Sequence, residues 1–297
     1  MAKILLAGEI CSEKQYFVDS IPVAKEVSFV NSVNTLTSSK IINAGRVLAQ
    51  ENSVSIFGIV GDDNDGKQAL SDLEKYGIDT RFVYTTNEAS TAQVLVLTNK
   101  NGQSAIVLNL SAINYFDESG LEKLSDYEYV YMATSIKLDQ IYKMIERASK
   151  DGVNVFLDFP NQQKEFDKEK LRTVDFVAPN RQEAELLLDL KITNVDEALE
   201  AVKKLKSFTD GTVIITLDTD GCVVFAKGWI EPKHFPTEAV TAIDETGSGD
   251  IFRGVFLNEY IKTNDIELSI KKALKLATES VRYQGVDKSI EQIKSLL

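Results

Sequence analysis

Cysteine and histidine are scarce in this sequence, which has only Cys11, Cys222 and His234 among its 297 residues. A framework of disulfide bonds is therefore not expected, and so few ligands cannot build a zinc site of cysteine and histidine. Long apolar runs are missing as well: the segment from Met1 to Gly8 is too short for a signal peptide, and no stretch approaches the roughly 18 apolar residues of a membrane span. These absences predict a cytoplasmic protein with no membrane partner.

Positive charge is also in short supply, because 33 lysine and arginine residues face 45 aspartate and glutamate residues and give a net charge of −12. An acidic chain is a poor candidate for binding nucleic acid or an anionic membrane surface. A nucleotide needs only a local cationic or amide-lined site, so the net charge does not argue against one. Hydrophobic residues make up 43% of the chain, which is enough for the core of one large α/β domain with a small appendage.

The pattern of apolar runs predicts alternating strands and helices. Residues 4–7 and 54–60 read as buried strands, and from residue 129 onward strands and helices alternate regularly. Alternation at this spacing implies a parallel sheet that is covered by helices on both faces, and ligands of such sheets bind at the carboxyl ends of the strands. Shorter β-like segments lie outside this pattern, at residues 16–18, 27–30, 33–36, 81–84, 92–97 and 105–108.

The most informative stretch runs from Asp244 to Gly254 and reads Asp-Glu-Thr-Gly-Ser-Gly-Asp-Ile-Phe-Arg-Gly. Gly247, Ser248 and Gly249 predict a turn into a helix, and such a turn leaves backbone N–H groups free at the positive end of the helix dipole. Glycine lets the backbone approach an anion closely because it has no Cβ atom. Asp250, in the first turn of the helix, can accept a proton from an attacking hydroxyl while the amides hold a phosphoryl group. An acidic cap on an ordinary helix start is the alternative.

This stretch resembles the signature of the ribokinase (PfkB) family of sugar and nucleoside kinases, D-T-x-G-A-G-D-x-F-x-x-G. Glu245 and Ser248 stand where the family often has Thr and Ala. The resemblance implies a kinase that moves the γ-phosphoryl group of ATP to a hydroxyl with the help of Mg²⁺. It also implies that Asp250 is the catalytic base and that Gly247, Ser248 and Gly249 form the anion hole.

The same resemblance implies a fold, a three-layer α/β sandwich with a mostly parallel central sheet flanked by helices, plus a small β-sheet lid. We expect residues 1–297 to form a single ribokinase-like domain, with lid strands inserted at about residues 12–38 and 81–110. Lid strands leave open edges if they are exposed, and in the family such edges often pair across a dimer. A homodimer through the lid is therefore expected.

Residues 38–49 open a predicted helix and resemble the acceptor loop of the family, G-G-x-x-x-N-x-A, with serine in place of both glycines. Asn43 matches the Asn of that motif, although a helix-start cap explains an Asn there equally well. The serines should narrow the acceptor pocket or add hydroxyl contacts. Glu13 stands where the family usually has an acceptor-binding Asp, five residues after the Gly that ends the first strand. The resemblance thus places these side chains at the acceptor: Glu13, Ser39, Lys40, Asn43 and Asp250.

Residues 179–185 resemble another family segment, P-N-x-x-E-A-E. In the family this Asn and the first Glu organise Mg²⁺ and its waters near the ATP phosphates, which implies that role for Asn180 and Glu183. A solvated residue in the first turn of a helix is the alternative for Glu183. The resemblance further implies that a monovalent cation such as K⁺ binds beside Asp244 and the loop after the predicted helix at 266–283.

Residues 216–222 resemble T-L-G-x-x-G, a turn that touches the nucleotide phosphates in the family. This implies nucleotide contacts by Thr216, Asp218 and Gly221. Asp218 replaces the first Gly of the motif. A carboxylate beside a triphosphate is unfavourable unless it points away or meets the metal ion.

Gly61, Gly66 and Lys67 have the spacing of a Walker A motif between a strand and a helix. Gln68 stands in place of the Ser or Thr that would hold Mg²⁺, and the acidic residues inside the loop would repel a triphosphate. A P-loop is therefore rejected. The segment instead resembles a further recurrent stretch of the same family, for which we expect a structural role.

Together these segments favour a ribokinase-type kinase that phosphorylates a hydroxyl of a small sugar or sugar-like acceptor. A nucleoside kinase of the same family is the first alternative, because Glu13 and the serines at 38 and 39 argue against assuming ribose. A non-catalytic small-molecule-binding protein on the same fold is the second, since Asp218 and the two serines would suit it. A dehydrogenase fits poorly because no G-x-G-x-x-G follows the first strand.

Overall fold

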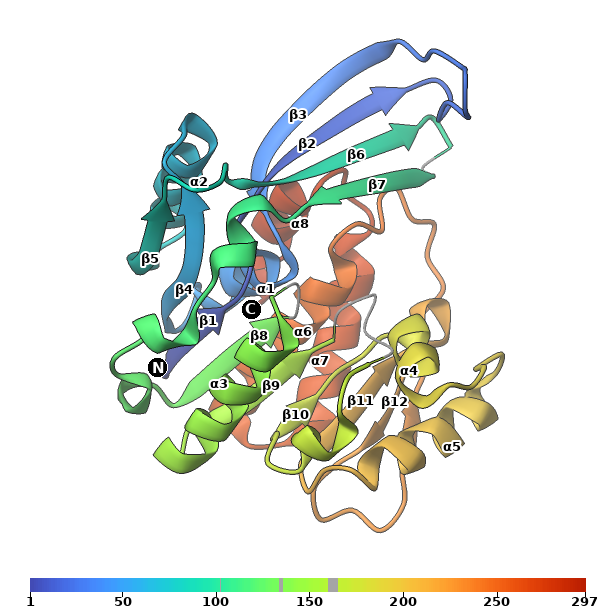
Figure 1. Ribbon diagram of the computed structural model, residues 1–297. Coiled ribbons are helices and arrows are strands. Elements are labelled where there is room, and N and C mark those ends of the chain that lie inside the picture. The colour runs from blue at the N-terminus through green and yellow to red at the C-terminus, as the bar shows by residue number, and fades with distance from the viewer. Residues whose placement is uncertain (102, 134–135, 160–164) are drawn as a thin grey trace.

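The main sheet of the protein has nine strands in the described part of the chain, as the computed structural model shows (Figure 1). The structure describes residues 1–101, 103–133, 136–159 and 165–297. The strands are β1 (Lys3–Ala7), β4 (Ser53–Gly61), β5 (Ile78–Thr86), β8 (Tyr129–Ala133), β9 (Asn154–Asp158), β10 (Phe176–Val177), β11 (Thr212–Thr216), β12 (Cys222–Phe225) and β13 (Lys233–Phe235). Their order across the sheet is β13-β12-β11-β10-β9-β8-β1-β4-β5. The pairs from β5 to β11 are parallel, whereas β12 and β13 add an antiparallel edge.

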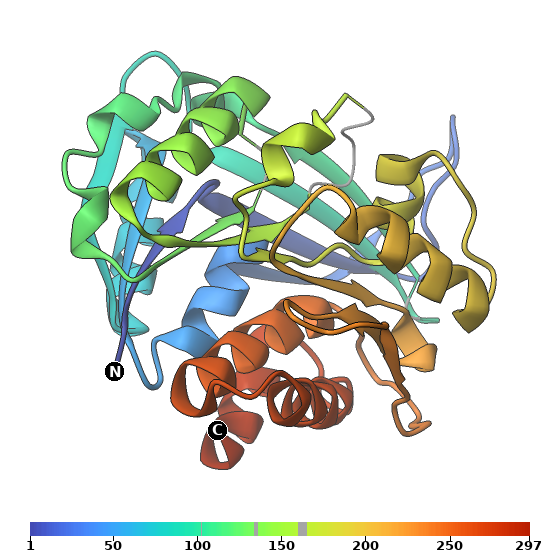
Figure 2. The same cartoon turned by 90° about the horizontal axis from the view of Figure 1, so that it is seen from below.

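Helices cover both faces of this sheet, so the predicted three-layer sandwich is confirmed (Figure 2). One layer contains α3 (Leu138–Asp151), α4 (Arg181–Leu188) and α5 (Val195–Lys206). The opposite layer contains α1 (Lys40–Leu48), α2 (Asn64–Lys75), α6 (Ser248–Thr263), α7 (Ile266–Ser280) and α8 (Val286–Ile293). Short 3₁₀ helices lie in the connections: η1 (Ser111–Tyr115), η2 (Glu118–Gly120), η3 (Leu124–Asp126), η4 (Lys168–Leu171), η5 (Asp218–Asp220) and η6 (Lys294–Leu296).

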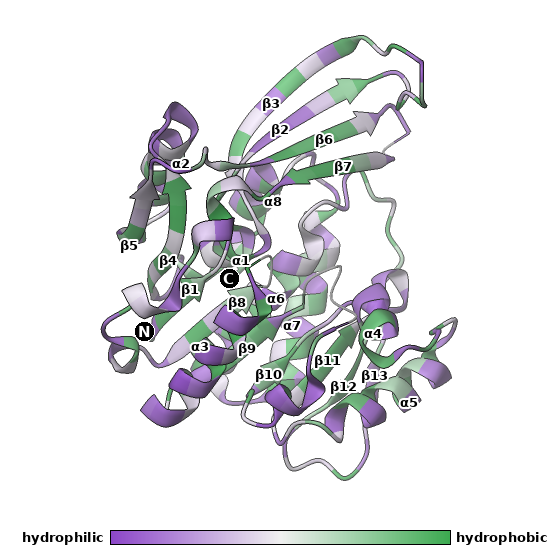
Figure 3. Cartoon of the chain, viewed as in Figure 1, coloured by the Kyte–Doolittle hydropathy of each residue, from purple (hydrophilic) through white to green (hydrophobic). Residues whose placement is uncertain are grey.

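Strand β1 shows how the sequence specifies this layering. Leu5 and Ala7 pack in the hydrophobic cluster under α3, whereas Ile4 and Leu6 pack in the cluster with α1 and α6. Successive side chains of a strand point to opposite faces, so a strand that is covered on both faces is apolar throughout. Figure 3 shows the central strands mostly in the hydrophobic colour and α3 largely in the hydrophilic one. Within the described ranges no helix has the length and apolarity needed to cross a membrane.

A separate small sheet lies beside the main one, in the order β3-β2-β6-β7 (Figure 1). Its strands are β2 (Cys11–Val18), β3 (Val30–Ser38), β6 (Ala92–Asn99) and β7 (Ser104–Asn109). Because β1 ends at Ala7 and β2 begins at Cys11, this sheet starts at the carboxyl edge of the main sheet. That is the edge where ligands of parallel sheets bind.

One predicted lid strand lies in the main sheet instead. Residues 81–84, expected within the lid insertion at 81–110, belong to β5, which pairs in parallel with β4. Helix α2 makes the crossover between these two strands. As the edge strand of the main sheet, β5 is only partly buried, so its residue pattern resembles that of a small exposed sheet. Among the described residues of the expected insertion, only those of β6 and β7 belong to the small sheet.

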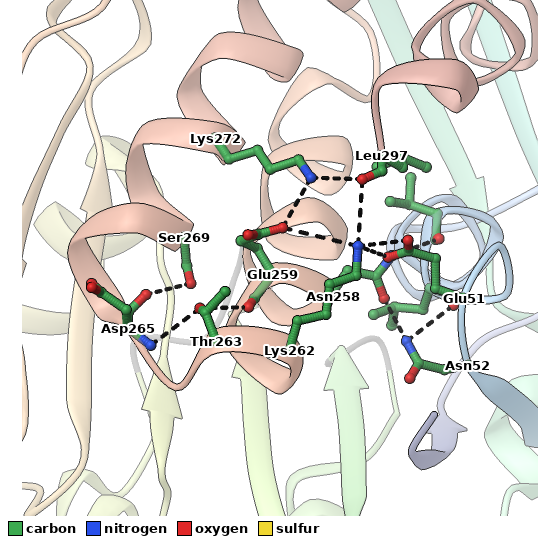
Figure 4. A network of polar contacts seen from close by, with 12 residues as sticks. Glu51, Asn52, Asn258, Glu259, Lys262, Thr263, Asp265, Ser269, Lys272 and Leu297 are labelled. Carbon is green, nitrogen blue, oxygen red and sulfur yellow. Dashed lines mark hydrogen bonds and ion pairs between the residues drawn. The ribbon is translucent and has the colours of Figure 1, made fainter.

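Helix α6 lies packed against α1 and α7, and all its residues from 250 to 259 are buried. Polar contacts at its carboxyl-terminal half fix it to its neighbours (Figure 4). Asn258 Oδ1 accepts a hydrogen bond from Asn52 Nδ2 (2.6 Å), and Glu259 Oε2 pairs with Lys272 Nζ of α7 (2.9 Å). The opposite end of α6, where Asp250 lies, is thus carried by a well-anchored helix.

Candidate active site

The turn before α6 requires glycine at its N-cap. Gly247 has a φ of 75°, and a Cβ atom there would come within 2.6 Å of Val286 Cγ2. In the described part of the chain the amides of Gly249 and Asp250 have no hydrogen-bond acceptor, as expected in the first turn of a helix. These amides and the helix dipole make the start of α6 suited to bind an anion.

Asp250 is buried beside this turn. Its Oδ2 accepts a hydrogen bond from Asn43 Nδ2 (2.9 Å), and its Oδ1 lies 3.8 Å from Arg253 Nη1. Burial raises the pKa of Asp250 to about 7 and Asp158 adds to the rise, whereas Arg253, Lys40 and Asn43 lower it. A carboxyl group with a pKa near neutrality is well matched to proton transfer at physiological pH.

The start of α1 brings the acceptor loop to Asp250. The cap of α1 is Ser39, whose Oγ accepts a hydrogen bond from the Ile42 N–H (3.3 Å) and donates to Glu9 O (2.9 Å). Asn43 lies inside α1, so its interpretation as a helix-start cap is wrong. Its side-chain amide instead contacts the Asp250 carboxylate.

Glu13 and Ser38 extend these contacts toward the small sheet. Ser38 Oγ donates to Asn43 Oδ1 (3.4 Å), and the Glu13 carboxyl group lies beside the same hydroxyl. Burial raises the pKa of Glu13, and the contact with Ser38 opposes that rise. A continuous chain of polar contacts therefore runs from Glu13 in β2 to Asp250 in α6. The serine that replaces a family glycine is a link in this chain.

A buried cluster of charges lies on the other side of Asp250. Lys40, the first residue of α1, places Nζ 2.5 Å from Glu183 Oε1 and 3.5 Å from Asp158 Oδ1. Arg253 Nε lies 3.3 Å from the same Asp158 oxygen, and Arg253 Nη2 lies 3.7 Å from Glu183 Oε2. Since Asp158 ends β9 and Glu183 lies in the first turn of α4, the cluster joins α1, α4, α6 and the carboxyl end of β9.

Asn180 and Glu183 form a capping box at the start of α4. The Glu183 N–H donates to Asn180 Oδ1 (2.8 Å), and Glu183 Oε2 accepts from the Asn180 N–H (2.7 Å). The Glu183 side chain is 1% exposed, so its interpretation as a solvated helix-start residue is wrong. Because Lys40 contacts its other oxygen, this carboxylate fits a Mg²⁺ ion that it orients through water better than one that it binds directly.

Thr216, Asp218 and Gly221 lie beside this capping box. Thr216 ends β11, bridges to Asn180, and donates its N–H to Pro179 O (3.2 Å). Asp218 has a φ of 53° and an exposed side chain, and this left-handed backbone explains why the related motif has glycine there. Gly221 closes the turn through its carbonyl, which accepts the N–H of Leu217 (2.8 Å). The turn and the start of α4 thus form one surface at the carboxyl edge of the sheet.

Asp244 ties the turn before α6 to the loop after α7. Its Oδ2 accepts a hydrogen bond from the Gly285 N–H (2.9 Å), and its Oδ1 accepts one from the Thr246 N–H (3.0 Å). The Asp244 N–H donates to Val281 O (3.1 Å). The structure therefore brings together the two segments at which a monovalent cation was expected.

Asp158 and Arg253 were not among the predicted site residues, although both belong to the buried cluster. Each left a signal in the sequence. Asp158 is a charged residue at the end of an apolar strand, and Arg253 follows Asp250 by one helical turn, on the same face of α6. A charge in either position needs a buried partner, and the two residues provide one for each other.

Comparison with known protein families matches residues 1–293 to the pfkB family of carbohydrate kinases. The chain is 26% identical over 239 residues to a deoxyribokinase of Salmonella typhi, a match that covers 79% of this chain and 78% of that protein. It is 28% identical over 265 residues to a ribokinase of Mus musculus, with 87% of this chain and 81% of that protein covered.

Solved structures share the fold. A ribokinase from Thermotoga maritima superposes with a TM-score of 0.87 at 22% identity, and 99% of each chain is covered. The Arabidopsis thaliana ribokinase complexed with ribose and ATP gives a TM-score of 0.86 at 21% identity, with 99% of this chain and 98% of that one covered. Since the family match extends over nearly the whole sequence, the chain belongs to the pfkB family of carbohydrate kinases.

Proposed function

We propose that the protein transfers the γ-phosphoryl group of ATP to a hydroxyl of a small sugar, with Asp250 as the base. The position of Asp250 supports this role, because its carboxyl group is buried, contacts Asn43 and adjoins the free amides at the start of α6. An ionised carboxylate there accepts the hydroxyl proton. The turn formed by Gly247, Ser248 and Gly249 stabilises the charge that develops on the transferring phosphoryl group.

The nucleotide is proposed to lie on the surface formed by the start of α4 and the turn at 216–221. Asn180 and Thr216 are paired there, and the exposed side chain of Asp218 remains in solvent, where screening weakens its repulsion of phosphate. Mg²⁺, when bound, neutralises phosphate charge. Asn180 and Glu183 would hold its waters, and the contact with Lys40 keeps the Glu183 carboxylate oriented.

The acceptor is proposed to bind between the small sheet and the start of α6, with the small sheet acting as a lid. Glu13 of β2 and Asn43 of α1 reach this region and offer groups that hydrogen-bond to hydroxyls. The Ser39 hydroxyl is engaged in capping α1, and Lys40 completes the acceptor side beside Glu183. A lid excludes water, which would otherwise compete as phosphoryl acceptor.

A monovalent cation, K⁺ being the first candidate, is proposed beside Asp244. The direct contact between Asp244 and the Gly285 amide supports this proposal, because it fixes a carboxylate next to the loop after α7. Asp244 also borders the turn that carries the anion-binding amides, so a cation bound there would stabilise the conformation of that turn. Turnover in KCl and in NaCl at equal ionic strength measures the effect.

The acceptor is identified by measuring ADP release with ATP, MgCl₂ and KCl against a panel of sugars, sugar acids and nucleosides. Release that depends on a sugar is the expected result. Release with nucleosides alone would favour the nucleoside kinase, which shares the fold and the base. Ligand binding without ADP release for any acceptor would favour a non-catalytic binding protein.

We expect kcat/KM to rise with pH through about 7 and then to level off, because Asp250 must be ionised to accept a proton. Burial and Asp158 raise the pKa of this carboxyl group, so the protonated, inactive form dominates below the midpoint. Activity should fall by about tenfold per pH unit on that side. The measurement is kcat/KM for the sugar from pH 5.5 to 9 at constant ionic strength. A plateau that extends down to pH 5.5 would contradict the assignment.

We further propose that two chains form a homodimer through the small sheet. Several of its apolar side chains are about half or more exposed, namely Val33, Ile106, Val107 and Leu108. Exposed apolar clusters and open strand edges both favour association. Sedimentation equilibrium should give about twice the 33.0 kDa mass of one chain. A mass of one chain at micromolar concentration would exclude the dimer.

A further inference from the structure

We propose that Arg253 is a positioning residue that holds the base Asp250, the metal-organising Glu183 and the anion-binding turn in one fixed arrangement. This inference rests on the proposed function of the site. It concerns a residue that acts through the groups proposed to contact the phosphoryl group and the acceptor.

The guanidinium group of Arg253 is only 3% exposed and directs each of its nitrogens to a different partner. Nε donates to Ala178 O (3.0 Å) and lies 3.3 Å from Asp158 Oδ1. Nη1 lies 3.8 Å from Asp250 Oδ1, and Nη2 lies 3.7 Å from Glu183 Oε2. A planar fork with a fixed geometry sets the directions of several carboxylates as well as their distances, whereas the ammonium group of a lysine acts as a single point charge.

Arg253 also lies directly against the turn that would hold the phosphoryl group. A Cβ atom at Gly249 would come within 3.0 Å of Arg253 Nη1. The guanidinium group therefore occupies the space that a side chain at Gly249 would need. One buried cation thus adjoins the base, the metal-organising carboxylate and the anion-binding turn.

In the described part of the chain, Nη2 is a buried donor without a hydrogen-bond acceptor. It faces Glu183 at 3.7 Å, which is beyond hydrogen-bonding distance. Buried donors are normally satisfied, and contacts in a ligand-free active site often tighten when the substrates bind. We infer that Nη2 and Glu183 form a hydrogen bond when the substrates are bound. That bond would couple the position of the metal-organising carboxylate to α6, the helix that carries Asp250.

Charged groups from several elements face Asp250, and they act in opposite directions. Asp158 of β9 raises its pKa, whereas Arg253 and Lys40 lower it. Asn43 of α1 donates to Asp250. Burial raises the pKa of Tyr131 of β8, and the Asp158 and Asp250 carboxylates add to that rise. Removal of the Arg253 charge should therefore shift the pH midpoint of kcat/KM upward, and removal of the Asp158 charge should shift it downward.

The experiment compares Arg253→Gln, Arg253→Lys and Asp158→Asn with the unchanged protein in the ADP-release assay. For Arg253→Gln we expect kcat to fall by about 10- to 100-fold, the scale of a misplaced catalytic group. We also expect a higher Mg²⁺ concentration at half-maximal rate, and a smaller change in KM for the acceptor. Arg253→Lys should keep the pH midpoint close to that of the unchanged protein, because lysine keeps the positive charge. Its kcat should still be reduced, because an ammonium group lacks the planar geometry of the guanidinium group. Arg172→Gln makes the same change at an arginine whose side chain is 53% exposed, so it is the matched control and should change nothing.

Opposite shifts of the pH midpoint in Arg253→Gln and Asp158→Asn support the proposal, since a purely structural role would not produce them. If all three variants kept the kcat and the pH midpoint of the unchanged protein, the proposal would be overturned. If Arg253→Gln does not fold in thermal unfolding experiments, two expectations remain to test the proposal: a reduced kcat at an unchanged pH midpoint in Arg253→Lys, and a lowered midpoint in Asp158→Asn. Unchanged turnover in Asp250→Asn would mean instead that the proposed base is wrong, so the two failures are distinguishable.

Discussion

Replacement of Asp250 by Asn is expected to lower kcat by about 10²- to 10⁴-fold, the usual contribution of a general base. Asn keeps the shape of the side chain, but it cannot take up the hydroxyl proton. The KM for ATP should change little, because the surface formed by the start of α4 and the turn at 216–221 is left intact. The measurement is ADP release with the best sugar of the acceptor panel.

Stability separates this loss from unfolding, because Asp250→Asn should make the protein more stable at high pH. The folded-state pKa of Asp250, about 7, lies above the value of about 3.9 for an unfolded Asp. The folded state therefore binds the proton more tightly, and stability is lost as pH rises from about 4 through 7. Asn has no charge to lose, so the gain in unfolding temperature over the unchanged protein should be larger at pH 8 than at pH 5.5.

A control for Asp250→Asn is Asp210→Asn, which makes the same chemical change at a side chain that is 79% exposed. It should leave both kcat and the unfolding temperature unchanged, since surface substitutions usually have small effects. If Asp250→Asn kept full turnover while remaining folded, another group would have to accept the proton. The pH midpoint near 7 would then need a different origin.

The main sheet could be predicted from the sequence because its signals are local. The apolar run at Ile4–Ala7 already requires helices on both faces, since adjacent side chains pack in opposite clusters. The residue pattern of β5 predicts a lid strand, and this prediction is wrong because edge strands of a main sheet and strands of a small exposed sheet share the same half-buried pattern. Only its pairing with β4, a contact set by the crossover through α2, distinguishes the two.

In the candidate site, too, contacts within one short segment could be predicted from the sequence, whereas contacts between distant segments could not. Gly247 and Asp250 lie in one short segment, so their geometry could be derived from a turn and a helix start. The contact of Asn43 with Asp250 joins residues that lie far apart in the sequence, and a cap was an equally good interpretation until the helix start was placed at Ser39. The spacing from Asp250 predicts that Arg253 lies on the same face of α6, but its other partners come from β9 and α4, and no spacing in the sequence predicts those contacts.

Replacement of Gly249 by Ala is expected to lower kcat by about 10²-fold with no loss of stability. The added Cβ atom would come within 3.0 Å of Arg253 Nη1, so the guanidinium group must shift by a few tenths of an ångström. That shift moves the contacts of Arg253 with Asp250 and Glu183, and the methyl group also stands on the turn proposed to bind the phosphoryl group. The unfolding temperature should change little, because the preference of a helix for Ala over Gly, up to about 1 kcal/mol, offsets the cost of displacing the guanidinium group.

Gly120→Ala provides the matched control, because its Cβ atom would meet only Phe57 and Tyr84 at 3.8 Å or more, an ordinary packing distance. If both variants lost activity equally, the loss would reflect a general sensitivity of the enzyme to an added methyl group and not a specific role of Gly249. If Gly249→Ala lost activity alone while remaining as stable as the unchanged protein, the small space between Gly249 and Arg253 would be reserved for catalysis. The absence of a side chain at Gly249 would then have two effects: it exposes the backbone amides to an anion, and it leaves space for the guanidinium group of Arg253.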